Sequence, residues 1–304
     1  MSLVITGASG HLGRRTAELL LDTDGVNAAD VVLVTRSPDK LADLAARGAQ
    51  ARHGNFADSD TLPAAFAGAT RVLLISTDAV GARVDQHKAA IDAAKAAGAQ
   101  LIAYTSFPNP DPDRNPASVV PEHAATEAAI LSSGLPYTFL RNAVYSEYVG
   151  SFSAQNPLTE GALVHNFGDG ASAYVSREDC AAAAAAVLAG GDEHAHKTYD
   201  IAGPEALTGG DLAALYTSVA GTEVKALSVD DATWIASALA HGLPEPAAMG
   251  VASFGRAIHE GALNQRSGDV ERLTGRKPVT VSEVLTSSLA SAGPRQQPNP
   301  GADR

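Results

Sequence analysis

The sequence predicts an α/β protein built on an open parallel sheet with helices on both faces, followed by a smaller, mainly helical lobe. Three observations support this fold class. Short apolar runs alternate with helix-like segments through residues 1–142. The runs are rich in β-branched residues and lack polar alternation, which is typical of parallel strands buried on both faces. Regular alternation of strand and helix also implies right-handed crossovers and a doubly wound sheet.

The individual elements follow from local signals. A helix starts near Pro38, because proline is favoured in a first helical turn. Gly134 is a typical helix end, and Ser176 is a helix cap with Asp179 at the third position. We expect strands at 3–5, 31–34, 49–52, 72–75, 101–104, 137–140 and 198–202, and further helices at 11–21, 62–67, 84–97, 121–133 and 179–188.

The alternation loosens from about residue 143, where a second structural unit begins. Several helices and one short strand near residues 224–227 are expected in this part. The end of the chain, 293–304, has three prolines and almost no hydrophobic residue, so we predict a disordered tail. The predicted domains are a main domain of residues 1–142 with 171–202 and a smaller lobe of residues 143–170 with 203–292.

Composition and charge exclude some classes of function. The 304 residues carry a formal net charge of −12 and no basic run, whereas nucleic-acid binding depends on clustered Lys and Arg. The single cysteine, Cys180, cannot form an intrachain disulfide. The N-terminus lacks the features of a signal peptide, and the longest apolar run, 180–189, is about half a membrane span. We expect a cytoplasmic protein that binds neither nucleic acid nor membrane, and a homodimer is left open.

The most informative motif is a glycine turn directly after the first predicted strand. Residues 6–13 read Thr-Gly-Ala-Ser-Gly-His-Leu-Gly, and the order strand, glycine turn, helix is that of a dinucleotide-binding Rossmann domain. Gly7 permits the sharp turn, Gly10 lets the backbone approach a pyrophosphate, and Gly13 lets the helix pack closely on the strand. The free N–H groups at the helix start then receive the anion.

Arg36 follows the second predicted strand and indicates which dinucleotide is bound. An acidic residue here would hold the 2′-hydroxyl of NAD, whereas a guanidinium suits the 2′-phosphate of NADP. Arg36 therefore predicts NADPH as the cofactor. Ser76 and Thr77 follow the fourth strand, where the cofactor's ribose is expected. The predicted cofactor-binding residues are Thr6, Gly7, Ser9, Gly10, His11, Leu12, Gly13, Arg36, Ser76, Thr77, Tyr104, Thr105 and Ser106.

Several segments together resemble one known family. They are residues 5–13, 34–38, 73–77, 94–98, 102–106, 122–127 and 137–147, with 197–199 and 273–276 near the end. On these segments the chain resembles the NmrA-like atypical short-chain dehydrogenases/reductases, in particular their branch of bacterial NADPH-dependent quinone oxidoreductases and triphenylmethane reductases. The resemblance runs from Ser2 to about Leu289. It implies an NADPH-dependent oxidoreductase that passes hydride to a planar, quinone-like small molecule.

The chain departs from the parent superfamily at the proton donor. That superfamily uses a Tyr and a Lys four residues apart. If Glu127 marks the Glu that follows them in extended members, Val119 and His123 occupy the Tyr and Lys positions. A reduced quinone is a phenolate-like anion with a pKa of about 10, so a weak donor or water suffices. His123 is a candidate catalytic group, expected to titrate near neutral pH, and a purely structural role is the alternative.

Other candidates lie where strands end or where the lobe begins. Tyr104, Ser106, Asn142 and Tyr145 are candidate catalytic or positioning residues. A flat slot for a planar acceptor is expected from Phe107, Phe139, Tyr145 and Tyr148. No metal is expected, because hydride transfer needs none and the histidines have no carboxylates at ligand spacing.

Two alternatives to a quinone reductase stay open. One is an NADP-binding redox sensor of the NmrA type that acts through a protein partner, which the missing Tyr and Lys would also fit. The other is an NADPH reductase of a different small molecule, such as an imine, a dye or a natural product. The segments 122–127 and 141–147 favour the quinone reductase.

Overall fold

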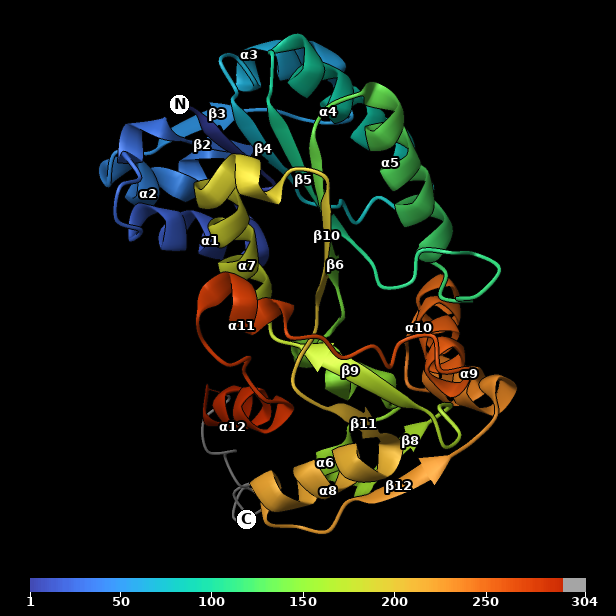
Figure 1. Cartoon of the computed structure of the whole chain (residues 1–304). Coiled ribbons are helices and arrows are strands. Elements are labelled where there is room, and N and C mark those ends of the chain that lie inside the picture. The colour runs from blue at the N-terminus through green and yellow to red at the C-terminus, as the bar shows by residue number, and fades with distance from the viewer. Residues whose placement is uncertain (292–304) are drawn as a thin grey trace, which may run out of the picture.

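The main layer of the protein is a parallel β-sheet. The structure, a computed structural model, describes residues 1–291, so the predicted tail at 293–304 lies outside the described residues. The sheet has seven strands in the order β10-β6-β5-β4-β1-β2-β3 (Figure 1). All neighbouring strands run parallel, which confirms the predicted doubly wound sheet. The strands are β1 (Leu3–Thr6), β2 (Val31–Thr35), β3 (Gln50–His53), β4 (Arg71–Leu74), β5 (Leu101–Ser106), β6 (Tyr137–Asn142) and β10 (Lys197–Ile201).

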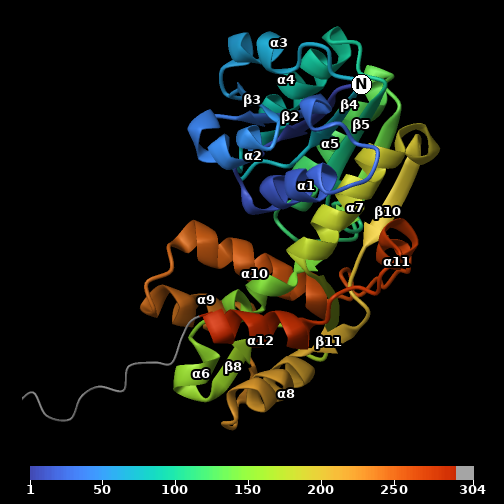
Figure 2. The same ribbon diagram turned by 90° about the vertical axis from the view of Figure 1, so that its left-hand side faces the viewer.

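Helices cover both faces of this sheet. Two of them, α1 and α7, pack together on one face, and α3, α4 and α5 lie on the other (Figures 1 and 2). Each face has its own apolar core, with Leu20 and Val187 buried on the α1 side and Phe66 and Ile130 buried on the α4 side. The helices are α1 (His11–Leu21), α2 (Ala42–Ala46), α3 (Leu62–Ala65), α4 (Arg83–Ala96), α5 (Val120–Ser133) and α7 (Arg177–Gly190).

The helix signals in the sequence have the predicted roles. Ser176 Oγ accepts a hydrogen bond from the N–H of Asp179 at 3.0 Å and caps α7. Gly134 ends α5 with a φ of 76°. The helix expected near Pro38 is a 3-10 turn, Pro38–Leu41, that continues as α2. Further 3-10 turns are η1 (Ala28–Asp30), η3 (Ser59–Thr61), η4 (Ser146–Phe152) and η5 (Gly191–His194).

The smaller lobe contains more β structure than the sequence predicts. The strand expected near residues 224–227 is present as β12 (Lys225–Ser228) and pairs with β8 (Ala162–His165). A second sheet, ordered β11-β9-β7, combines β7 (Val144–Tyr145), β9 (Ala171–Val175) and β11 (Ala206–Thr208). β9 therefore lies in a sheet of the lobe, although its residues are predicted as part of the main domain. These strands are short, and their pairing depends on tertiary contacts rather than on local propensity.

Helices enclose the small sheets and reach back to the main domain. α10 lies along the side of the lobe that faces the main sheet, and α11 packs against α7 and β10 (Figures 1 and 2). The lobe residues are therefore not confined to one end of the molecule. The helices of this part are α6 (Pro157–Glu160), α8 (Gly209–Ala220), α9 (Asp231–Ala240), α10 (Glu245–His259), α11 (Asp269–Thr274) and α12 (Val281–Ser291).

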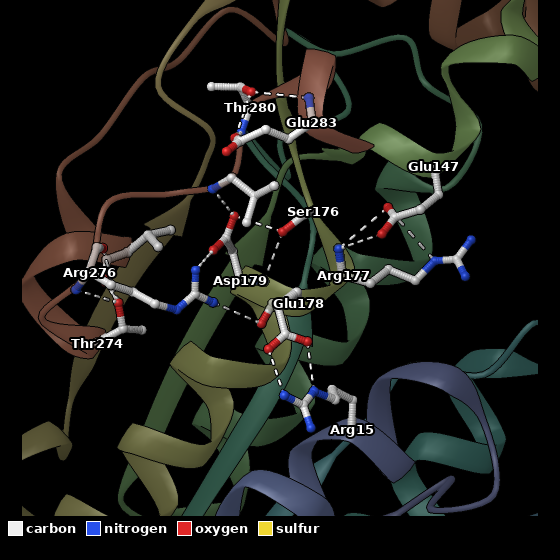
Figure 3. A network of polar contacts seen from close by, with 12 residues as sticks. Arg15, Glu147, Ser176, Arg177, Glu178, Asp179, Thr274, Arg276, Thr280 and Glu283 are labelled. Atoms are coloured by element: carbon white, nitrogen blue, oxygen red, sulfur yellow. Dashed lines mark hydrogen bonds and ion pairs between the residues drawn. The ribbon is translucent and has the colours of Figure 1, made fainter. Parts of the chain in front are cut away.

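A polar network ties the last part of the lobe to the main domain (Figure 3). Asp179, on α7, is fully buried, and its carboxylate accepts hydrogen bonds from Arg276 Nη1 at 2.6 Å and from the N–H of Val279 at 2.8 Å. The neighbouring Glu178 accepts from Arg15 Nε, on α1, at 2.7 Å. The segment after α11 is thus held on the N-terminal turn of α7.

Candidate active site

The glycine turn has the geometry that the sequence predicts. Gly7 has a φ of 61°, a backbone conformation that L side chains rarely adopt. A Cβ on Gly13 would lie 2.6 Å from the carbonyl oxygen of Gly7, so only glycine lets α1 pack this closely against the turn. A Cβ on Gly10 would lie 3.3 Å from the same oxygen. The turn is therefore a bare backbone cradle at a helix N-terminus, which fits a pyrophosphate.

A cavity of about 800 Å³ opens beside this turn. It lies at the carboxyl ends of β1, β2 and β4, where the strand order reverses, which is the ligand position of doubly wound sheets. Most of the predicted cofactor-binding residues line it, whereas Thr6, Tyr104, Thr105 and Ser106 are buried outside its lining. The predicted residues in the lining are Gly7, Ser9, Gly10, His11, Leu12, Gly13, Arg36, Ser76 and Thr77.

Arg36 lies on the wall of this cavity, directly after β2. Its side chain is exposed on the cavity wall and makes no hydrogen bond or ion pair with any other residue of the described part of the chain. The preceding Thr35 has its Oγ1 atom 2.7 Å from Ser9 Oγ, which ties the end of β2 to the glycine turn. Arg36 therefore offers an unpaired guanidinium at this end of the cavity.

Thr77, just after β4, is held in place by its backbone. Its N–H donates to His87 Nε2 at 3.1 Å, and its carbonyl accepts from Arg83 Nε at 2.6 Å. The same loop is fixed by the N–H of Gly81, which donates to Glu122 Oε1 at 2.8 Å. Thr77 Oγ1 is buried without a hydrogen-bond partner among residues 1–291. An unpartnered hydroxyl on a cavity wall is suited to contact a polar group of a ligand.

Two predicted cofactor residues brace the strand ends from behind the wall. Thr6 Oγ1 donates to the carbonyl of Leu73 at 3.0 Å and accepts from the N–H of Ile75 at 3.0 Å. Thr105 Oγ1 accepts from the N–H of Ser76 at 2.9 Å. These hydroxyls align the carboxyl ends of β1, β4 and β5 and so position the residues that do face the cavity.

His123 is buried, with 6% of its surface exposed. Its Nδ1 lies 2.8 Å from the hydroxyl of Tyr104, and its Nε2 lies 3.5 Å from Arg83 Nη1. Because a guanidinium can only donate, we assign Nε2 as the unprotonated nitrogen and Nδ1–H as the donor to the tyrosine oxygen. Burial and the charge of Arg83 lower the pKa of His123 to about 3. The expectation that His123 titrates near neutral pH is therefore wrong.

Tyr104 and Ser106 are also engaged inside the protein. Tyr104 is fully buried, and this burial raises the pKa of its phenol well above the usual value. Ser106 Oγ donates to Glu127 Oε1 at 2.6 Å, and Glu127 Oε2 accepts from Arg141 Nη2 at 2.8 Å. In this structure the two side chains hold α5 against β5 and β6.

Asn142 and Tyr145 lie at the start of the lobe, beside the cavity. Tyr145 lines the cavity, and Asn142 Nδ2 donates to its hydroxyl at 3.5 Å. Asn142 Oδ1 is buried and has no hydrogen-bond partner among residues 1–291. The ring of Tyr148 lies 5.9 Å from that of Tyr145, and the Arg177 guanidinium lies 4.9 Å from the Tyr148 ring centroid. The wall here presents the aromatic faces of Tyr145 and Tyr148, and Asn142 lies behind Tyr145.

The four aromatic residues expected in one flat slot do not gather there. Tyr145 and Tyr148 line the cavity. Phe139 is buried in the core of the main sheet, and Phe107 stacks on His123 with ring centroids 5.8 Å apart. The slot is therefore formed by two tyrosines, because the strand that carries Phe139 turns this side chain into the sheet core.

A second cavity, of about 760 Å³, lies in the lobe behind η4. Ser146 and Gly150 line it, whereas Tyr145 and Tyr148, from the same stretch, line the first cavity. Residues 145–150 therefore separate the two cavities. Ser146 Oγ is buried without a hydrogen-bond partner in the described chain. The other walls are mainly apolar and include Leu158, Leu243, Val251, Leu285 and Leu289.

Arg83 and Arg177 line this cavity, and His87 holds the N–H of Thr77 behind it, but none of the three is predicted from the sequence alone. Arg83 is the first residue of α4. A cation in the first turn of a helix is unfavourable to the helix dipole, and this is the signal that could have found it. Arg177 also starts a helix and lines the cavity.

The described residues contain neither a group suited to hold a metal ion nor a helix able to span a bilayer. Within residues 1–291 no group of three or more His, Cys, Asp and Glu side chains is placed to hold a metal ion. None of the helices in this part of the chain has the length and apolar character needed to span a bilayer.

The glycine turn, the unpaired Arg36 and a cavity at the point where the strand order reverses define a dinucleotide-binding α/β protein. The chain belongs to the NAD(P)H-binding family, which matches residues 7–190. It is 38% identical to quinone oxidoreductase 2 of Escherichia coli over 93% of this chain and 97% of that protein.

Solved structures and one further relative agree with this match. The crystal structure of the NADPH-dependent quinone oxidoreductase QOR2 of Escherichia coli complexed with NADPH matches with a TM-score of 0.89 and 36% identity, over 94% of this chain and 99% of that chain. Triphenylmethane reductase of Citrobacter sp. complexed with NADP(H) matches with a TM-score of 0.86 and 31% identity, over 94% and 100%. An NmrA-like family domain-containing oxidoreductase of Aspergillus flavus is 29% identical over 74% of this chain and 73% of that protein. The resemblance inferred from the sequence is confirmed.

Proposed function

We propose that this chain is an NADPH-dependent oxidoreductase that transfers hydride to a planar, quinone-like small molecule. The observation that carries the proposal is the cavity at the carboxyl ends of β1, β2 and β4, which has a bare glycine cradle and an unpaired Arg36 on its wall. Similarity to a quinone oxidoreductase over 93% of the chain supports the same function. When bound, NADPH supplies the hydride.

Different residues of the chain bind different parts of the cofactor. The N–H groups at the start of α1, beside Gly10 and Gly13, hold the pyrophosphate. Arg36 holds the 2′-phosphate with paired, charge-assisted hydrogen bonds. At the other end, the hydroxyl of Thr77, which has no hydrogen-bond partner among residues 1–291, donates to or accepts from the nicotinamide ribose.

The acceptor lies between the main domain and the lobe. Tyr145 and Tyr148 offer aromatic faces on the cavity wall, on which a flat ring can stack. Catalysis in this arrangement depends mainly on orientation, because the fold holds the nicotinamide and the acceptor face to face. Water then supplies the proton, because burial raises the pKa of Tyr145 well above its usual value. His123 and Tyr104 act as structural supports behind the wall.

The proposal also includes the location of the protein and its partner. Cys180 is buried and unpaired, which fits a reducing compartment, and we place the protein in the cytoplasm. Its partner is a small-molecule acceptor.

The decisive experiment is oxidation of NADPH, followed by loss of the nicotinamide absorbance, with a panel of benzoquinones and naphthoquinones. Turnover with several quinones is the expected result, and NADH in place of NADPH should be clearly less effective. Triphenylmethane dyes belong in the same panel, because the similarity to a triphenylmethane reductase favours them as the second class of acceptor. Tight NADPH binding without turnover of any acceptor would contradict the enzyme and favour the redox sensor.

A further inference from the structure

Arg83 is a buried guanidinium on the wall of the cofactor cavity. It is only 6% exposed and still belongs to the cavity lining. Its Nε donates to the carbonyl of Thr77 at 2.6 Å, and its Nη1 lies 3.5 Å from His123 Nε2 and 3.6 Å from Glu122 Oε2. Its third nitrogen, Nη2, has no hydrogen-bond partner among residues 1–291. Two N–H donors of a permanently charged group therefore remain available at the wall.

The strand order places Arg83 at the reactive end of the cavity. β2, which carries Arg36 at its end, lies on one side of β1, and β4 lies on the other. A dinucleotide with its 2′-phosphate on Arg36 and its pyrophosphate on the glycine turn extends toward β4 with its nicotinamide end. Thr77 and Arg83 follow β4, so they lie where the hydride is transferred.

We propose that Arg83 contacts the acceptor and stabilises the negative charge that develops on it. The inference rests on the function proposed above. Hydride addition to a quinone leaves a hydroquinone monoanion, NADPH becomes NADP⁺, and a proton from water completes the hydroquinone. A fixed cationic donor beside the acceptor oxygen stabilises this anion without itself losing a proton. Arg83 thereby compensates for the missing Tyr and Lys pair of the parent superfamily. It stabilises the charge on the reduced acceptor instead of donating a proton.

The neighbours of Arg83 determine how strongly its positive charge acts on the acceptor. His123 is neutral and faces Arg83 with its unprotonated nitrogen, so it fixes the guanidinium without repelling it. Glu122 is the counter-charge, at 3.6 Å from Nη1. Glu122→Gln removes this counter-charge but keeps an amide oxygen that can accept from the N–H of Gly81. The variants Arg83→Gln and Glu122→Gln should therefore change anion binding in opposite directions, whereas a purely structural cluster predicts a loss in both.

The first test measures anion binding without turnover. The probe is 4-nitrophenol, whose phenolate absorbs visible light, titrated with the NADP⁺-loaded protein. We expect the wild-type protein to lower the pKa of the bound probe by about 1 pH unit, as a cation within contact distance does. Arg83→Gln should return the pKa to its value in free solution, and Glu122→Gln should lower it further. Arg114→Gln, which changes an exposed arginine outside the cavity, is the matched control.

The second test separates charge stabilisation from cofactor binding. Arg83→Gln should lower kcat with a quinone by about 100-fold, as loss of one preorganised donor does, with a much smaller change in the NADPH dissociation constant. Arg83→Lys keeps the charge and should retain the probe shift. Arg83→Met, which keeps the aliphatic stem and removes the charge, replaces Arg83→Gln if that variant fails to fold, and it should lose the shift.

An unchanged probe pKa in Arg83→Gln, or a loss of NADPH affinity as large as the loss of kcat, would overturn the proposal. Failure of the proposed function is a distinct result. In that case the wild-type protein oxidises no NADPH with any quinone, while the probe titration still reports whether Arg83 stabilises a phenolate.

Discussion

Arg276 and Asp179 lie 97 residues apart in the sequence and form an ion pair of 2.6 Å on the N-terminal turn of α7. Asp179 is fully buried, whereas the Arg276 side chain is 38% exposed. The pair joins the segment after α11 to the helix that packs on α1 and the main sheet (Figure 3). Because α7 begins directly after β9, this contact fixes the lobe relative to the cofactor cavity.

Asp179→Asn should therefore destabilise the protein. The variant leaves Arg276 without its charge partner and weakens the hydrogen bond from the N–H of Val279. We expect a loss of about 2 kcal/mol in the free energy of unfolding, less than for a sealed ion pair because Arg276 can reach water. Urea unfolding followed by circular dichroism measures the loss. Arg47→Ala breaks the more exposed ion pair with Asp22 and should leave the midpoint unchanged; equal midpoints for both variants would contradict the assigned role of Asp179.

Arg36→Asp should change the preference between the two nicotinamide cofactors. The guanidinium has no partner among residues 1–291, so it is free to bind the 2′-phosphate, which NADH lacks. Loss of the charge-assisted hydrogen bonds should weaken NADPH binding by roughly 100-fold, whereas NADH binding should stay the same or tighten, because Asp can hold the 2′-hydroxyl. Isothermal titration with both cofactors measures the two dissociation constants. Arg47→Asp makes the same change of charge outside the cavity and is the control; parallel losses for NADPH and NADH in Arg36→Asp would refute the assignment.

The buried histidines predict a dependence of stability on pH. Burial lowers the pKa of His87 and of His123 from 6.5 to about 3. Between pH 6.5 and about 3, these two side chains are protonated in the unfolded chain and neutral in the folded chain. Stability from these groups is therefore complete above pH 6.5 and is lost as the pH falls toward 3.

His123→Asn tests this dependence. With one proton fewer taken up on unfolding, its free energy of unfolding should fall less steeply than that of the wild type, by about 1.4 kcal/mol per pH unit around pH 5. Urea unfolding at a series of pH values gives both slopes. His241→Asn, at the exposed residue that follows α9, should keep the wild-type slope. Identical slopes for His123→Asn and the wild type would show that His123 protonates inside the folded protein.

The sequence predicts the main sheet well, because its strands are local features. Runs such as 31–34 and 101–104 are apolar throughout and are bounded by turn residues. Their burial on both faces can therefore be predicted without tertiary information. The strands of the lobe have no such pattern. β9 contains two alanines and a serine and becomes a strand only because β7 and β11 lie beside it.

The candidate site likewise contains residues that local sequence predicts and residues that depend on tertiary contacts. The glycine turn and Arg36 are recognisable because the cofactor imposes a fixed order of strand, turn and cation on a short stretch of chain. His123 is different, because its pKa depends on contacts with Tyr104, 19 residues away, and with Arg83, 40 residues away. The same holds for Arg83, whose burial depends on the packing of α4 against α5.

Gly13→Ala tests the geometric basis of the cofactor site. The added Cβ would lie 2.6 Å from the carbonyl oxygen of Gly7 and 2.9 Å from Cα of Ala8, both of which are backbone atoms that cannot rotate away. The start of α1 must shift, so we expect a loss of about 2 kcal/mol in the free energy of unfolding and at least about tenfold weaker NADPH binding. Gly268→Ala adds the same methyl group where no atom lies within 4 Å, and its binding and stability should match the wild type. If Gly13→Ala bound NADPH as tightly as Gly268→Ala, close packing of α1 on the turn would not be what forms the pyrophosphate cradle.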